Sequence, residues 1–140
     1  MLIKTRYFGN QEVDPRSILF FPEGFAGFEE CHRFKLFHEQ TDQPVIHFLQ
    51  SLDEPGLAFS VVIPRHLGLG YDLPLSSKET SLLKTTNWEE LLILVLLISQ
   101  QEADGPRVRP SIEHPLLINP ESRRGLQIHL RPGEYELSPG

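Results

Sequence analysis

The sequence predicts one mainly β domain over residues 1–140, a single-domain antiparallel β-barrel-like fold with one or two short helices. Short segments rich in β-branched and aromatic residues recur along the chain, and residues typical of turns separate them. No internal repeat and no low-complexity tract interrupts this pattern. Hydrophobic residues make up 39% of the chain and charged residues 23%, both near the globular average. Only the tail, about residues 133–140, is expected to be loosely held.

The strand predictions rest on side-chain patterning. The expected strands lie at residues 3–8, 17–21, 33–39, 44–51, 58–62, 71–73, 91–99, 107–112, 116–119 and 125–130. Residues 126–130 alternate between apolar and polar side chains, which predicts a strand with one face on a core. Residues 45–50 are largely apolar on both faces, as a more central strand would be.

One helix is expected over residues 77–84. Ser76 and Glu79 have the spacing of a capping box, in which each side chain satisfies a free backbone N–H of the first turn. Leu82 and Leu83 would then face the sheet, so this helix is predicted to cover it.

The next segment is ambiguous from its sequence. Asn87 and Glu90 repeat the capping spacing, so the apolar run at residues 91–98 also fits a buried helix. The run is only eight residues long and contains Ile93, Val95 and Ile98. Its length and branched side chains favour a central strand, preceded by one helical turn at residues 87–90.

The composition predicts a soluble cytoplasmic protein. Cys31 is the single cysteine, so no internal disulfide can form, and an unpaired thiol suits a reducing compartment. The N-terminus has no apolar signal segment. The longest apolar run is far shorter than the roughly 20 residues that cross a bilayer, so no membrane partner is expected.

Acidic residues outnumber basic residues, and they are unevenly spread. The formal net charge is −6, which disfavours nonspecific binding to nucleic acid and favours basic partners. Residues 1–60 hold nine acidic and five basic side chains, whereas residues 107–131 hold five arginines and two glutamates. The arginine-rich segment contains no aromatic residue on which bases could stack, so no direct nucleic-acid partner is expected.

No pattern of catalytic, cofactor-binding or metal-ligating residues is found. None of the six histidines has the spacing of a metal site. Cys31 directly precedes His32, which does not aim a base at a thiolate, so Cys31 is expected to be a buried apolar residue. The Gly68–Gly70 segment lacks the further glycine or lysine of a phosphate-binding loop. The sequence therefore predicts a protein that is not an enzyme and has no cofactor.

Two clusters of phenylalanine, proline and glycine stand out in the first half of the chain, at residues 20–28 and 48–59. Together with Thr5-Arg6-Tyr7-Phe8-Gly9 and the segment at 115–127, they resemble the bacterial flagellar assembly factor FliW family in order and spacing. The resemblance covers nearly the whole chain. It implies a small β-barrel-like protein that binds the translational regulator CsrA and antagonises it, which relieves repression of flagellin translation. It also implies that the protein binds flagellin as an assembly factor or chaperone.

The partner-binding residues are predicted in the two clusters. Phe25 and Phe28 are the expected anchors, because a few desolvated aromatic side chains usually dominate an interface. The expected polar rim consists of Glu23, Gln50, Asp53 and Glu54. An Asp53→Lys change is expected to weaken CsrA binding with little effect on the thermal midpoint. The same clusters also fit a purely structural role, in which the turns pin strands together.

Two other functional classes fit the predicted fold. A small-ligand-binding β-barrel would have an apolar internal cavity with a few convergent polar groups. An RNA-binding module would bind with an affinity that falls steeply with salt concentration. The oligomeric state and the sharing of one surface by both partners are not determined by the sequence.

Overall fold

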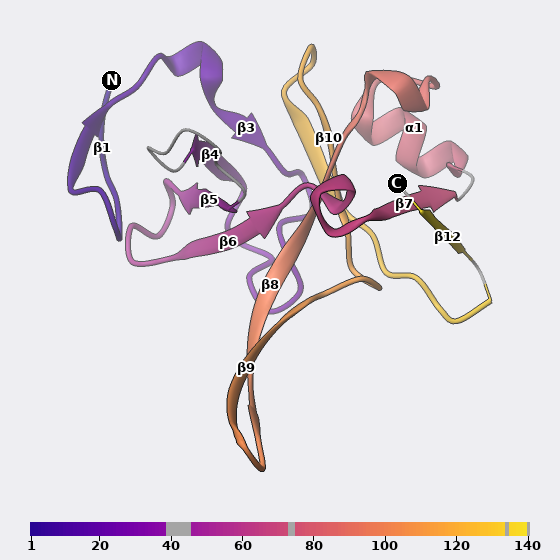
Figure 1. The fold of residues 1–140 in the computed structure, drawn as a ribbon. Helices are drawn as coiled ribbons and strands as arrows, with labels where there is room; N and C mark the ends of the chain where they lie inside the picture. The colour runs from indigo at the N-terminus through magenta and orange to yellow at the C-terminus, as the bar shows by residue number, and fades with distance from the viewer. Residues whose placement is uncertain (39–45, 73–74, 134, 140) are drawn as a thin grey trace.

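Seven strands close into a barrel in the computed structural model, which describes residues 1–38, 46–72, 75–133 and 135–139 (Figure 1). The barrel strands are β3 (Leu19–Phe20), β4 (Arg33–His38), β5 (Ile46–Ser51), β6 (Ala58–Val62), β8 (Leu92–Glu102), β10 (Leu116–Asn119) and β11 (Arg124–Gln127). Their order is β10-β11-β3-β4-β5-β6-β8, and β8 pairs back with β10 to close the ring. All neighbours are antiparallel except β11 and β3, which are parallel.

The remaining elements lie around the barrel. They are β1 (Leu2–Lys4), β2 (Asn10–Glu12), η1 (Pro15–Ser17), η2 (Pro64–Leu67), β7 (Leu69–Asp72), α1 (Ser77–Leu83), η3 (Trp88–Glu90), β9 (Gly105–Pro110) and β12 (Glu136–Pro139). The small sheets β1–β2 and β7–β12 lie on opposite sides of the barrel (Figure 1). Among the described residues, no helix is long and apolar enough to cross a membrane.

The barrel interior is filled by an aromatic cluster. The Phe25 ring lies 4.9 Å from the Phe21 ring, 4.8 Å from the Phe34 ring and 5.0 Å from the Phe59 ring, measured between centroids. Phe21 and Phe34 are completely buried. These contacts combine apolar burial with the tilted and edge-on geometries that aromatic pairs prefer. Leu49, from the predicted central strand, is buried in the same cluster.

A second apolar cluster lies between α1 and the barrel. Leu83 of α1 packs with Leu117, Leu126 and Ile128, all of them buried. The predicted capping box is present: Ser76 Oγ accepts from the Glu79 N–H, and Glu79 Oε1 accepts from the Ser76 N–H. The prediction of a helix that covers the sheet is therefore confirmed. The burial also alternates at residues 126–130 as predicted, but the strand predicted over 125–130 is too long, because β11 ends at Gln127.

A long hairpin of β8 and β9 projects from the barrel (Figure 1). The Ser111 N–H donates to the Leu96 carbonyl at 2.7 Å. Because hydrogen-bonded pairs alternate along an antiparallel pair of strands, the N–H and C=O groups of residues 106, 108 and 110 point away from β8. Pro106 and Pro110 have no N–H, which leaves Val108 with the single outward donor. The free edge of β9 is thus protected against pairing with another strand.

The first predicted strand is wrong in its length. Of the segment at residues 3–8, only residues 3–4 belong to a strand, β1, and residues 5–8 lie in the turn that leads to β2. The Thr5 hydroxyl accepts from the Phe8 N–H at 2.8 Å and donates to the Gly9 carbonyl at 2.6 Å, and Gly9 has a φ of +67°. These local hydrogen bonds turn the chain before a longer strand can form.

Other boundaries also differ from the predictions. The start of the expected strand at 17–21 belongs to η1, because Asp14 caps it and Pro15 begins it. The helical turn at 88–90 is confirmed, and the strand after it runs on to Glu102. Residues 136–139, expected to be loosely held, form β12 and pair with β7. The predicted strand ends at residues 39, 44–45 and 73 lie outside the described residues.

We expect Gly125→Ala to lower the free energy of unfolding by about 2 kcal/mol or more. A methyl group on Gly125 would overlap the Phe21 ring, which has no space to move inside the aromatic cluster. Urea unfolding followed by circular dichroism measures the change. Gly56→Ala is the matched control, because no atom lies within 4 Å of the added Cβ. Equal losses in the two variants would contradict the prediction.

Candidate functional site

The first predicted cluster is a loop that buries one phenylalanine and leaves another partly exposed. The Phe28 N–H donates to the Phe25 carbonyl at 2.8 Å, and the Phe25 N–H donates back to the Phe28 carbonyl at 3.3 Å. Gly27 has a φ of +85°, which closes this turn. Gly24 approaches the loop so closely that a Cβ would lie 2.7 Å from the Phe28 carbonyl oxygen. The loop therefore has one fixed shape.

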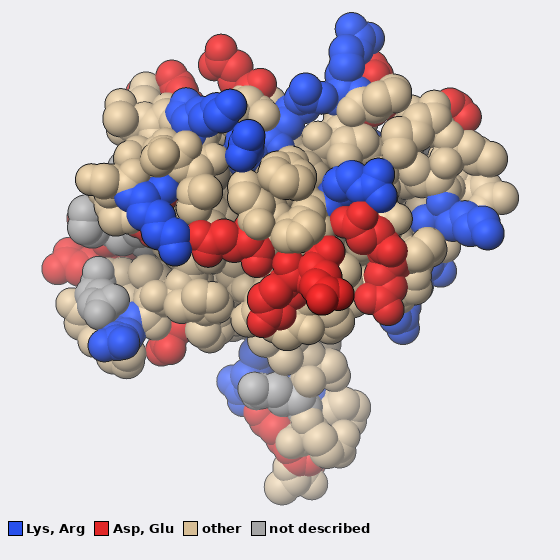
Figure 2. Space-filling model, turned by 180° about the vertical axis from the view of Figure 1, so that it is seen from behind, with Lys and Arg blue, Asp and Glu red and all other residues tan. Residues whose placement is uncertain are grey.

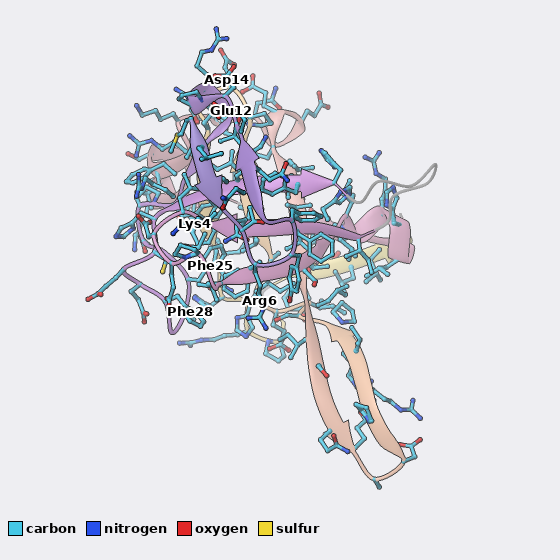
Figure 3. The ribbon with its side chains drawn as sticks, turned by 90° about the vertical axis from the view of Figure 1, so that its left-hand side faces the viewer. Lys4, Arg6, Glu12, Asp14, Phe25 and Phe28 are labelled. Atoms are coloured by element: carbon cyan, nitrogen blue, oxygen red, sulfur yellow. The ribbon has the colours of Figure 1, made fainter. Side chains whose placement is uncertain are left out.

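The two rings differ in exposure, although the two residues are paired across this turn. Phe25 is 3% exposed and fills the aromatic cluster, whereas Phe28 is 38% exposed. The Phe28 ring still contacts the Phe59 ring edge-on, with centroids 5.7 Å apart. Figure 3 shows Phe28 farther out on the loop than Phe25. Phe28 thus offers apolar surface to solvent on a rigid support.

The second predicted cluster is a turn that Asp53 fastens to β4. The Asp53 carboxylate accepts from the backbone N–H groups of His32 and Arg33 at 2.8 and 2.9 Å. It also accepts from the Arg33 guanidinium, with Nε at 2.9 Å. Partial burial by itself would raise the pKa of Asp53, but these hydrogen bonds and the Arg33 charge outweigh it and lower the pKa below 3.8.

The two clusters meet around an acidic hollow. A depression with a volume of about 320 Å³ is lined by Gly27, Phe28, Glu29, Glu30, Cys31 and Glu54. The three glutamates are exposed, so carboxylates surround an exposed phenylalanine. Figure 2 shows acidic side chains gathered in the middle of one face, above the projecting hairpin. The arrangement is suited to contact with a basic surface that carries an apolar side chain.

Two of the residues predicted to contact a partner, Gln50 and Phe25, are buried and do not lie at the surface. Gln50 is 1% exposed, and its side-chain amide donates to the carbonyls of Ser51, Pro55 and Leu57. Its oxygen accepts from the Arg6 N–H at 2.9 Å. Gln50 is therefore an internal brace of the turn and not part of a rim. Phe25 is likewise a core residue, because its ring is enclosed by three other rings.

The other predicted residues remain at the surface, in different surroundings. Glu54 lines the hollow with Phe28. Glu23 forms an exposed ion pair with Lys78 at 3.1 Å and links the loop to α1. Asp53 is fully engaged with β4, so the expectation that Asp53→Lys would spare the thermal midpoint does not fit the structure.

Glu29 and Glu30 belong to the site, although they were not predicted from the sequence. Both line the hollow beside Phe28. The sequence feature that could have indicated them is their position directly after Phe28, within the acid-rich first sixty residues. It was insufficient because the turn direction that places them beside Glu54 depends on contacts across the barrel.

Two of the five arginines in the arginine-rich segment form ion pairs, and a third lies against an aromatic ring. Glu102 forms ion pairs with Arg107 at 3.0 Å and with Arg109 at 2.5 Å. The Arg124 guanidinium lies 5.4 Å from the centre of the Phe20 ring. These contacts engage three of the five arginines in the segment, which disfavours an RNA-binding surface built on Arg107, Arg109 and Arg124.

Two pairs of histidines lie close together, and Cys31 is buried. His38 and His47 approach to 2.8 Å between their Nδ1 atoms, and His114 and His129 approach to 2.9 Å. Within the described ranges, no group of three or more His, Cys, Asp or Glu side chains could hold a metal ion. Cys31 is buried, as predicted.

Comparison with known proteins identifies the family. A family model described as FliW protein matches residues 2–139. The chain belongs to the FliW family. Flagellar assembly factor FliW of Azoarcus sp. strain BH72 is 38% identical over 130 residues, covering 91% of this chain and 89% of the relative. The FliW of Chromobacterium violaceum is 36% identical over 134 residues, covering 91% of each chain.

A solved FliW structure confirms the predicted fold class. A crystal structure of the flagellar assembly factor FliW superposes with a TM-score of 0.81 at 26% sequence identity, covering 97% of this chain and 93% of the other. The resemblance of the sequence to the FliW family is therefore confirmed, together with the mainly β, barrel-like architecture.

We expect Asp53→Asn to lower the free energy of unfolding at pH 7 by about 1–2 kcal/mol, because the variant loses charge-assisted hydrogen bonds. The folded pKa of Asp53 lies below the ordinary 3.8, so its stabilisation is complete above that pH and is lost as the pH falls through the folded pKa. The stabilities of the two proteins should therefore converge at low pH.

Chemical denaturation at a series of pH values measures this difference. Glu54→Gln is the control, since it removes a neighbouring exposed carboxylate that lines the hollow. A pH-independent difference for Asp53→Asn, or an equal loss for Glu54→Gln, would contradict the assignment.

Proposed function

We propose that the protein is a non-enzymatic cytoplasmic regulator of flagellum biogenesis that binds CsrA and flagellin. In this proposal it antagonises CsrA and so relieves repression of flagellin translation. Flagellin that has not been exported binds the protein and releases CsrA. Family membership over residues 2–139 supports a role in flagellum assembly, because the relatives are named flagellar assembly factors.

The acidic hollow is the observation that carries the CsrA part of the proposal. CsrA binds RNA, so a basic surface on it would complement Glu29, Glu30 and Glu54. Carboxylates at the edge of an interface mainly accelerate encounter and fix orientation. Most of the affinity would come from an apolar anchor that is desolvated on binding.

Phe28 is the proposed anchor. Its exposed surface lies inside the hollow, and its inner edge rests on Phe59, so little conformational entropy is lost when a partner covers it. Phe25 and Gln50 contribute indirectly by holding the shapes of the two turns. Asp53 contributes in the same way through its bonds to His32 and Arg33.

The direct test is calorimetric titration of the protein into CsrA from the same organism at physiological salt, followed by flagellin. We expect saturable binding of CsrA that flagellin reverses. Absence of CsrA binding would refute the proposed antagonism. Binding of CsrA that flagellin leaves unchanged would refute the proposed switch.

Charge reversal at the edge of the hollow should slow association with CsrA. For Glu54→Lys we expect a decrease in the association rate constant of about five- to tenfold, and this decrease should diminish at high salt. Surface plasmon resonance at two salt concentrations measures both effects. Glu136→Lys on β12 makes the same charge change at an exposed position that does not line the hollow. Equal slowing in the two variants would indicate a net-charge effect without a local site.

Removal of the anchor should affect dissociation instead. We expect Phe28→Ala to weaken CsrA binding by about 30-fold or more, mainly through faster dissociation. Because the ring is partly exposed, the thermal midpoint should fall only slightly. Circular dichroism melting separates the two effects. An unchanged affinity in a folded variant would remove Phe28 from the interface.

A further inference from the structure

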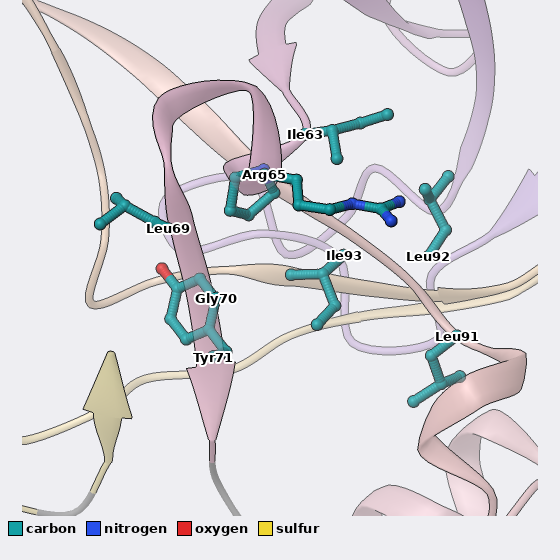
Figure 4. Close-up of a pocket in the computed structure, with 9 residues that line it drawn as sticks. Ile63, Arg65, Leu69, Gly70, Tyr71, Leu91, Leu92 and Ile93 are labelled. Carbon is teal, nitrogen blue, oxygen red and sulfur yellow. The ribbon is translucent and has the colours of Figure 1, made fainter. Parts of the chain in front are cut away.

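A second depression lies between β7 and the start of β8, apart from the acidic hollow. It has a volume of about 250 Å³, and Figure 4 shows Leu69, Gly70 and Tyr71 on one side and Leu91, Leu92 and Ile93 on the other. It shares no lining residue with the acidic hollow. We call this depression the β7 cleft.

The walls of the β7 cleft are apolar and firmly supported. Ile63 and Leu92 pack against the aromatic cluster in the barrel. Tyr71 packs in the second apolar cluster, and its hydroxyl donates to the Ile112 carbonyl. With its hydroxyl engaged in this way, Tyr71 presents its ring to the cleft. The cleft therefore offers a preformed apolar surface that branched or linear aliphatic side chains would fill.

Among the described residues that line the cleft, Arg65 provides the single charged side chain. Its guanidinium group extends across the cleft between Ile63 and Leu92 (Figure 4). Within the part of the chain that the structure describes, the Arg65 side chain is exposed and forms no ion pair. A cation beside an apolar wall attracts a carboxylate more strongly than one surrounded by water, because the wall excludes solvent on one side.

The backbone of β7 adds a further recognition element. All four of its residues pair with β12 through one edge, and its other edge has no strand partner among the described residues. Gly70 lines the cleft without a side chain, which permits close approach of another backbone. An extended segment could therefore add hydrogen bonds to this edge, as in other cases of strand addition.

We propose that the β7 cleft binds an extended peptide segment that places aliphatic side chains in the cleft and a carboxylate on Arg65. The volume of the cleft fits a few side chains and is below that of typical cofactor sites, roughly 300–1,000 Å³. The carboxylate is either the C-terminus of the bound chain or an acidic side chain within it. This site is independent of the proposed CsrA contact, so either proposal can fail without the other.

The test uses three pentapeptides, each with an N-terminal BODIPY label that carries no carboxylate, and fluorescence anisotropy with the full-length protein. The first is Gly-Ser-Val-Leu-Leu with a free carboxylate, and the second is the same peptide with a C-terminal amide. The third is the amide with glutamate in place of serine. We expect saturable binding of the first or third peptide and at least about tenfold weaker binding of the second, which has no carboxylate. The carboxylate peptide that binds with the higher affinity shows whether Arg65 binds a C-terminal carboxylate or an acidic side chain.

Arg65→Gln should weaken binding of the carboxylate peptides about tenfold and leave the amide peptide unaffected. Arg131→Gln is the matched control, because Arg131 is exposed and does not line the cleft. Amide chemical shifts from NMR should change at Gly70 and Ile93 and stay constant at Glu29 and Glu54. No saturation up to about 1 mM peptide, equal affinity in Arg65→Gln, or shifts confined to the acidic hollow would overturn the proposal.

Discussion

The contacts of the buried Phe25 ring hold the rest of the structure in place. This ring touches Phe21, Phe34 and Phe59, so a loop between β3 and β4 is joined to three parts of the barrel wall. Phe21 in turn packs so closely on β11 that only glycine fits at position 125. Burial of these rings is the largest concentrated source of apolar stabilisation in the barrel, and it also sets the direction of the 25–28 turn.

The acidic hollow depends on this interior packing. Phe25 lies inside the barrel, whereas Phe28, its partner across the turn, is partly exposed, and Glu29 and Glu30 follow it at the surface. The Asp53 carboxylate accepts hydrogen bonds from the backbone N–H groups at the start of β4, and this places the neighbouring Glu54 at the acidic hollow. The candidate site is therefore built from exposed side chains on turns that buried or hydrogen-bonded side chains hold rigid, which limits the entropy lost on binding.

The acidic hollow and the β7 cleft both border one aromatic core. Cys31 lines the hollow, Ile63 and Leu92 line the cleft, and all three contact the same cluster. The two depressions differ in chemistry, since one is acidic around an exposed ring and the other is apolar beside a cation. A protein with both surfaces could engage two segments of different charge, and packing through the core offers a physical connection between them.

Features that depend on neighbouring residues could be predicted from the sequence. These were the capping box at Ser76 and Glu79, the helical turn before β8 and the alternating burial from Leu126, because caps and alternation act within a few residues. The FliW resemblance was carried by whole blocks in order. Tertiary packing buries Gln50 and Phe25 and brings Glu29 and Glu30 beside Glu54, and neither outcome could be predicted from the sequence. Burial depends on strand register and on ring packing across the barrel, which local patterns do not specify.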